Sequence, residues 1–130
     1  MVEEISLRIP YFEALCCLRD ADALIVLGSD DSGYTASKIF PYILANRPLL
    51  AIFHEDSSVV NLIRSTNSGR VVTFNGATDV ELVSAEIEAH WRHSGSEPEV
   101  QTKWSAFDSY TARQMTRKLC GIFDGVAVSG

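Results

Sequence analysis

The chain has 130 residues, 46% of them hydrophobic, which suits one domain with one hydrophobic core. Its formal net charge of −6 at pH 7 argues against a nucleic-acid-binding surface, because such surfaces carry a basic patch. Apolar runs such as residues 23–27 are far too short to cross a bilayer, and the acidic, mixed N-terminus is unlike a signal peptide. We therefore expect a cytoplasmic protein with no integral membrane segment and no nucleic-acid partner.

The three cysteines are Cys16, Cys17 and Cys120. An odd count without framework spacing is typical of a reducing compartment. Cys16 and Cys17 are adjacent within an apolar stretch of helical spacing. We therefore expect both to be small buried hydrophobic residues.

Short apolar runs alternate with helical patterns, which is typical of a parallel sheet with crossover helices. In chain order, the patterns predict a strand at 5–9, a helix at 11–19, a strand at 23–27, a helix at 35–45, a strand at 49–53, a helix from 57 or 58 to 69, a strand at 71–74, a helix from 78 to 95 and a last helix at 104–123. The strands at 23–27, 49–53 and 71–74 are expected to be parallel neighbours. The predicted fold class is α/β: one Rossmann-like, three-layer domain over 1–130, with three or four parallel strands and a C-terminal helix at 103–124.

Capping residues predict several helix boundaries. Ser57 or Ser58 is expected to cap the helix that follows the second buried strand, and Gly69 to end that helix as a C-cap residue. Thr78 and Glu81 have the spacing of a capping box at the start of the next helix.

The segment 28–38, GSDDSGYTASK, points to ligand chemistry. Its glycines and small hydroxyl residues let the backbone approach a ligand, and the helix after it offers N–H groups and a positive dipole end to a phosphate. Thr35 and Ser37 are candidate caps or phosphate donors, and Lys38 in the first turn could neutralise phosphate charge. An ordinary capped loop with a solvated lysine is the alternative interpretation.

Pro41 affects the same helix. It lacks the N–H that a helix interior requires. The helix is therefore expected to begin late, near Ser37 or Lys38, or to kink at Pro41.

Four segments of the chain together resemble the donor-binding domain of GT-B glycosyltransferases of the group 1, family 4 kind. They are residues 22–27, 33–42, 46–51 and 68–72. The shared pattern is a strand, a glycine-containing loop, a helix carrying Lys38, a strand entered through Arg47 and Pro48, and a Gly-x-Val-Val strand. The resemblance covers nearly the whole chain. It implies a half-domain that binds a nucleotide diphosphate-sugar. The segment with Phe107, Tyr110, Arg113 and Phe123 is similar to the family's C-terminal helix, which reaches back to the N-terminal domain.

The chain departs from the family pattern in several ways. The helix carboxylate that holds the donor ribose in the family falls on Pro41 here, and the earlier carboxylate of the same motif falls on or near Gly33, with Asp30 and Asp31 just upstream. The N-terminal acceptor domain of the family, at least one strand–helix–strand unit ahead of Val2, and the basic residues that grip the diphosphate from that part are absent from the sequence. Because GT-B catalysis takes place between two domains, the resemblance implies that the isolated chain is inactive, and we assign it no catalytic residue and no cofactor.

Polar residues also follow the second buried strand, at the end where parallel sheets bind ligands. Glu55, Ser57 and Ser58 are expected to line a sugar pocket, with a helix cap as the alternative role of the serines. Metal binding needs ligands from several elements in fixed geometry. We assign no metal to the 54–56 segment or to the pair His90 and His93.

Two functions from different classes remain open. The first is a donor-binding half-domain that transfers a sugar only when an N-terminal acceptor domain completes it. The second is a non-catalytic remnant that acts as a dimerising or nucleotide-sensing interaction module. The expected ligand-binding residues are Gly33, Tyr34, Thr35, Ser37, Lys38, Glu55, Ser57 and Ser58. A half-domain leaves apolar surface uncovered, so we also expect a homodimer through the last helix or the edge of the first strand.

Overall fold

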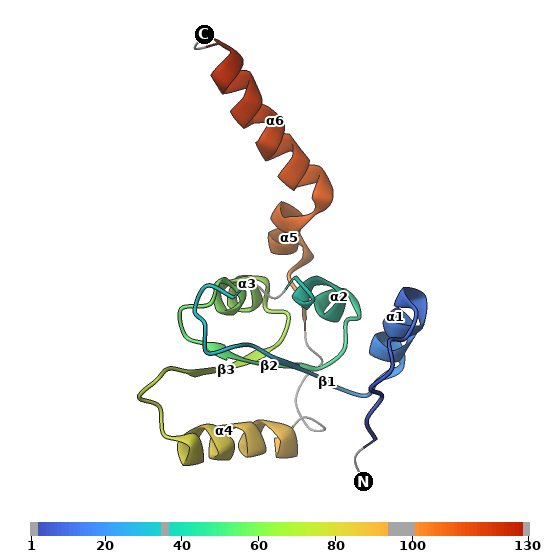
Figure 1. Ribbon diagram of the computed structural model, residues 1–130, viewed down its shortest axis with the longest axis vertical. Helices are drawn as coiled ribbons and strands as arrows, with labels where there is room; N and C mark the ends of the chain where they lie inside the picture. Colours follow the sequence, from blue (N-terminus) through green and yellow to red (C-terminus); the bar gives the residue numbers. More distant parts are fainter. Residues whose placement is uncertain (1–2, 35–36, 94–100, 129–130) are drawn as a thin grey trace.

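The structure is a computed structural model that describes residues 3–34, 37–93 and 101–128. Its elements are α1 (Tyr11–Asp20), β1 (Leu24–Leu27), α2 (Ile39–Leu44), β2 (Leu49–His54), α3 (Ser58–Thr66), β3 (Arg70–Phe74), α4 (Val80–His93), α5 (Trp104–Phe107), the 3-10 helix η1 (Asp108–Tyr110) and α6 (Ala112–Val128). The fold is α/β, with a small open sheet and helices around it (Figure 1).

The three strands form one parallel sheet in the order β1-β2-β3. Ala51, in the central strand, pairs with Val26 of β1 and Val71 of β3. The prediction that these three apolar runs are parallel neighbours is confirmed.

The crossover helices α2 and α3 lie on one side of the sheet, and α4 lies on the other (Figure 1). The connections from β1 to β2 and from β2 to β3 both lead to the next strand in the same direction across the sheet. Right-handed crossovers therefore place both helices on the same face. The core fills the space between these helices and the sheet, where Phe53, Ile39, Ile43 and Ile63 are almost completely buried.

The face on the side of α4 is covered unevenly. Side chains alternate along a strand, so Leu50 and Val72 share this face with Ile25 and Leu27 of β1. Leu50 and Val72 are buried, whereas Ile25 and Leu27 are 42% and 65% exposed. The edge strand β1 thus keeps an apolar strip in contact with solvent.

The helix α2 begins later than the predicted 35–45 pattern. Ser37 and Lys38 form a turn, and the helix has only six residues, beginning at Ile39. Pro41 is the third residue of this helix. At that position a backbone N–H has no partner within the helix, so the missing N–H of proline costs little stability. The late start expected from Pro41 is confirmed, but Lys38 occupies the N-cap position rather than the first turn.

Ser57 caps α3 as predicted, because its Oγ accepts a hydrogen bond from the Val59 N–H at 3.4 Å. The predicted C-cap is wrong. Asn67, with φ of 50°, takes the left-handed conformation at the end of α3. Gly69 has a packing role instead, since a Cβ at this position would lie 2.7 Å from the carbonyl oxygen of Leu49.

The capping-box prediction for α4 is also wrong about the capping residue. Asp79 Oδ1 accepts a hydrogen bond from the Glu81 N–H at 2.9 Å, so Asp79 caps this helix. The Thr78 hydroxyl closes the preceding turn instead, accepting from the Asn75 N–H at 2.8 Å.

The predicted single helix at 104–123 is divided into α5, η1 and α6. Thr111 is extended, with ψ of 148°, and so interrupts the helical hydrogen bonding. Phe107 packs into the core, whereas α6 extends away from the sheet (Figure 1).

Two predictions near the N-terminus are wrong. Residues 5–9 form no strand, and Ile5 and Leu7 are 63% and 82% exposed. The helix expected at 11–19 is present as α1, but Cys16 and Cys17 are exposed rather than buried. The physical reason is that α1 packs on the rest of the chain along one side only, through residues such as Leu18.

Among the helices that the structure describes, none combines the length and the hydrophobicity needed to span a membrane.

Candidate functional site

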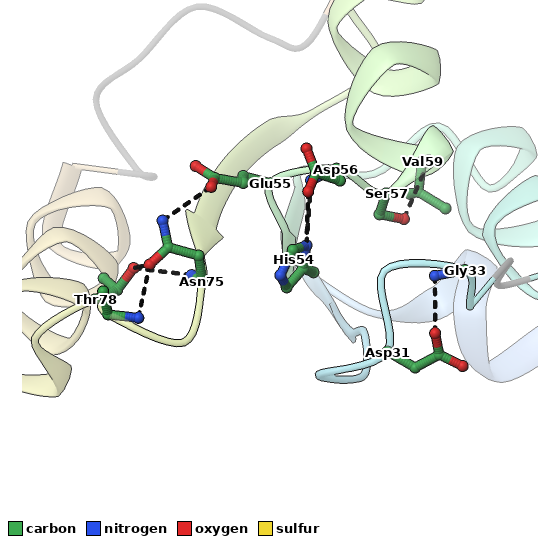
Figure 2. A network of polar contacts seen from close by, with 10 residues as sticks. Asp31, Gly33, His54, Glu55, Asp56, Ser57, Val59, Asn75 and Thr78 are labelled. Atoms are coloured by element: carbon green, nitrogen blue, oxygen red, sulfur yellow. Dashed lines mark hydrogen bonds and ion pairs between the residues drawn. The ribbon is translucent and has the colours of Figure 1, made fainter.

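Three loops meet at one edge of the sheet. The loops 28–38 (described at 28–34 and 37–38), 55–57 and 75–79 each follow the carboxyl end of a strand, and because the strands are parallel these ends lie together (Figure 2). Ligands of open parallel sheets bind outside this edge. The predicted ligand-binding residues fall in these loops or at the first residue of α3.

The first loop begins with a close approach between Gly28 and β2. The Gly28 N–H donates to the Ile52 carbonyl at 2.8 Å. A Cβ on Gly28 would lie 2.5 Å from the Phe53 ring. Only glycine fits here without displacing a core side chain, and this contact fixes where the loop leaves the sheet.

Asp31 closes the loop on itself. The Gly33 N–H donates to Asp31 Oδ1 at 2.9 Å, and the Tyr34 N–H donates to the Asp31 carbonyl at 3.0 Å. These are two of the amides expected to lie under a phosphate. A phosphate bound to the Gly33 amide therefore has to displace the Asp31 carboxylate (Figure 2).

The other described residues of the predicted phosphate loop are exposed. Ser37 and Lys38 are exposed in the turn before α2, and Tyr34 is 41% exposed. Thr35 lies outside the described residues. Because α2 has six residues and not the eleven of the predicted helix, its dipole contributes little to anion binding.

The second loop is held close to the sheet. The Glu55 N–H donates to the Phe74 carbonyl at 2.9 Å, and the Ser57 N–H donates to the His54 carbonyl at 2.9 Å. His54 Nδ1 lies 3.3 Å from the Asp56 N–H as an acceptor, which leaves the ring proton on Nε2 in the neutral imidazole. Ser57 is buried at the start of α3, while Ser58 is exposed.

Asn75 joins the third loop to the second. Its Oδ1 accepts from the Ala77 N–H and from the Thr78 hydroxyl, both at 2.9 Å. The Ala77 N–H needs an acceptor, and within the Asn75 amide only Oδ1 can accept. The amide nitrogen therefore points the other way, where it donates to Glu55 Oε1 at 2.9 Å (Figure 2). This bond holds the Glu55 carboxylate in one orientation although it lies at the surface.

The sheet edge is acidic. The three loops contain five carboxylates (Asp30, Asp31, Glu55, Asp56 and Asp79) against a single lysine, Lys38. Carboxylates accept hydrogen bonds from hydroxyl groups, as a sugar or ribose presents them, but they repel phosphate. The arrangement therefore favours hydroxyl recognition across the edge and confines cationic binding of a phosphate to Lys38.

No group of three potential metal ligands occurs among the described residues. His90 lies instead between Arg70, whose Nη1 is 3.3 Å from Nδ1, and Glu86, whose Oε1 is 3.7 Å from Nε2. The side chain of His93 lies outside the described part of the chain. His54, the last residue of β2, contacts Asp56 in the next loop and the ring of Phe74 in β3.

Sequence reasoning did not predict that Asp31 closes the first loop or that Asn75 joins the third loop to the second. Each residue had a local signal. Asp31 stands two residues before Gly33, the spacing of an Asx turn, and Asn75 begins an Asn-Gly pair after a buried strand. The contact between Asn75 and Glu55 had no local signal, because 20 positions separate the two residues.

Comparison of the chain with protein-family models, curated proteins and solved structures found no match. The functional interpretation therefore depends on the three loops themselves.

Proposed function

We propose that the carboxyl edge of the sheet binds a nucleotide diphosphate-sugar. In this proposal the chain is the donor-binding half of a GT-B-type glycosyltransferase, with the three-layer Rossmann-like organisation of that family, in the cytoplasm. It transfers the sugar only when an N-terminal acceptor domain completes the cleft. The observation that carries the proposal is the convergence of the loops 28–38, 55–57 and 75–79 at the ligand-binding edge of a parallel sheet.

The proposed roles follow from the chemistry of the side chains. Lys38 and the Ser37 hydroxyl contact the diphosphate, because Lys38 supplies the only lysine or arginine charge in the three loops. Glu55 accepts hydrogen bonds from sugar hydroxyls, and Asn75 orients its carboxylate before the ligand arrives. Pre-orientation reduces the entropy lost on binding.

The affinity is expected to be weak. Five carboxylates surround one lysine, and Pro41 stands where the family has its ribose-holding carboxylate. Displacement of Asp31 from the Gly33 amide adds a further cost. We expect dissociation constants of about 100 μM or above, which corresponds to roughly 5 kcal/mol of binding free energy.

Calorimetric titration with UDP, GDP and their sugar conjugates tests these roles. Lys38→Ala should weaken binding of both the free diphosphate and the sugar conjugate by about ten- to a hundredfold, because one charge-assisted hydrogen bond is lost. Glu55→Gln should weaken only the sugar conjugate, since it changes a hydroxyl acceptor and leaves the phosphate contact intact. Lys103→Ala is the matched control. Lys103 lies at the far end of α3 from the three loops, where its N–H donates to the Thr66 carbonyl.

The proposal fails if neither ligand class binds at millimolar concentration, or if Lys38→Ala titrates like the unaltered chain. Equal losses for UDP and its sugar conjugate with Glu55→Gln would remove the sugar role of Glu55 and leave the phosphate role of Lys38.

One observation favours the second function, an interaction module without catalysis. The Gly33 and Tyr34 amides are already occupied by Asp31 in the ligand-free chain. A segment that closes its own phosphate loop has less need of a ligand to be ordered. Failure of the titrations would make this the better assignment.

A further inference from the structure

Helix α6 is capped by its own flanking residues and does not depend on the sheet for its start. The Thr111 Oγ1 accepts from the Gln114 N–H at 3.4 Å, and Gln114 Nε2 donates to Asp108 Oδ2 at 3.0 Å. Thr111 is thus the N-cap, and the Gln114 side chain ties the first turn of α6 to Asp108 of η1. The helix is therefore an independent unit that follows η1.

One face of α6 is apolar and exposed. The α6 stripe consists of Met115, Leu119, Ile122, Phe123 and Val126. Their spacing of three, four and seven residues places them on one side of the helix. Each is between 51% and 69% exposed, and no side chain from 112 to 126 is buried. Figure 1 shows the helix extending away from the sheet, with no other labelled element beside it.

We propose that the α6 stripe is a self-association surface, and that two copies of the chain pair through it as antiparallel helices related by a twofold axis. This proposal does not depend on nucleotide-sugar binding.

The helix dipole and Lys118 favour the antiparallel orientation. Arg113, Arg117 and Asp124 lie on the side of the helix away from the stripe, whereas Lys118 flanks the stripe in the first half of the helix. An antiparallel pair directs each Lys118 toward the half of the partner helix that carries the negative end of the dipole. A parallel pair places the two Lys118 side chains side by side and aligns both dipoles.

The area of the α6 stripe is adequate for a dimer. Five large side chains that are each more than half exposed present roughly 500 Å² in one copy, and about 1,000 Å² in a pair, which reaches the lower range of specific interfaces. A twofold axis at the middle of the stripe sets Met115 against the partner's Val126 and Leu119 against the partner's Ile122. Such self-complementarity is what a twofold interface requires.

Sedimentation equilibrium of the full chain tests the proposal. The unaltered chain should be a reversible dimer at micromolar concentration. Leu119→Glu should raise the dimer dissociation constant by about tenfold or more, because it places two carboxylates in the apolar interface. Arg117→Gln on the opposite face of the helix is the matched control, since it changes the net charge by the same amount and should leave the constant within about twofold.

Intermolecular distances between spin labels test the orientation. With Cys16, Cys17 and Cys120 replaced by serine, a label at position 112, on the same side of the helix as the stripe, should give a distance above about 20 Å in an antiparallel pair and near 10 Å in a parallel pair. A chain that stays monomeric at high micromolar concentration overturns the proposal. A dimer that Leu119→Glu does not weaken overturns the assignment to α6, and a short distance at position 112 overturns the antiparallel arrangement.

Discussion

Two glycines in this protein are required by the close approach of neighbouring atoms and not by an unusual backbone conformation. Gly28 faces the Phe53 ring, and Gly69 faces the backbone and side chain of Leu49. Both glycines lie where β2 meets a neighbouring strand, so a Cβ at either position would push against the central strand. Glycine at these positions sets the close approach of the three strands.

Gly69→Ala should lower the free energy of unfolding by about 1–3 kcal/mol, because the new Cβ would lie 2.7 Å from the Leu49 carbonyl oxygen and the backbone must shift. Urea denaturation followed by circular dichroism measures this change. Gly76→Ala is the control, since a Cβ there meets nothing within 4 Å. Equal stability of the two variants would contradict the packing role of Gly69.

Adjacent serines at the start of α3 should differ in their contribution to stability. Ser57 is buried and caps the helix, whereas Ser58 is exposed in its first turn. Ser57→Ala should cost about 1 kcal/mol through the lost cap, and Ser58→Ala should be nearly neutral. Thermal unfolding of both variants checks the difference, and a larger loss from Ser58→Ala would reverse the capping assignment.

At the scale of elements, the helices differ in what stabilises them. α3 packs against the sheet with Val59, Val60, Leu62 and Ile63 buried, so tertiary contacts support it. In α6 no described side chain is buried, so intrinsic helix propensity and the cap at Thr111 carry more of its stability.

Gly121→Ala should therefore stabilise α6. A Cβ at this position meets nothing within 4 Å, and alanine is favoured over glycine by about 1 kcal/mol in a helix interior. Amide hydrogen exchange across α6 should slow by up to about fivefold, with the β2 amides unchanged. Unchanged or faster exchange in α6 would indicate that contacts outside the helix control its opening.

On the scale of the whole molecule, the chain divides into a packed sheet with its helices and a projecting α6. Phe107 joins the two parts, because it is buried in the core and its ring lies 6.3 Å from those of Phe40 and Tyr110. The aromatic contacts end at Tyr110, one residue before the break at Thr111.

A chain that ends at Tyr110 should keep the fold of the sheet, with an unfolding midpoint within about 5 °C of the full-length midpoint, and should lose self-association. A chain that ends at Lys103 should unfold at a much lower temperature, because it also loses the buried Phe107 ring. Calorimetry and light scattering compare the two. Loss of cooperative unfolding in the longer chain would show that α6 supports the core.

The sequence by itself determined the features that depend on neighbouring residues. Apolar runs located β1, β2 and β3, and the helical patterns between them predicted a parallel sheet. Pro41 set the late start of α2, and Ser57 capped α3. For the candidate site, the same rules placed Lys38 and Glu55 in loops at the carboxyl edge.

Only the tertiary structure decided the features that depend on distant residues. Asn75 orients Glu55 across 20 positions, Gly69 is required by Leu49, and Cys16 is exposed because α1 has a partner on one side only. The spacing of apolar residues in a segment predicts which of its faces is buried. It does not predict which other segment of the chain packs on that face. The exposure of the apolar face of α6 is a further case. No described residue packs on that face, and the spacing of residues within 112–128 could not predict this.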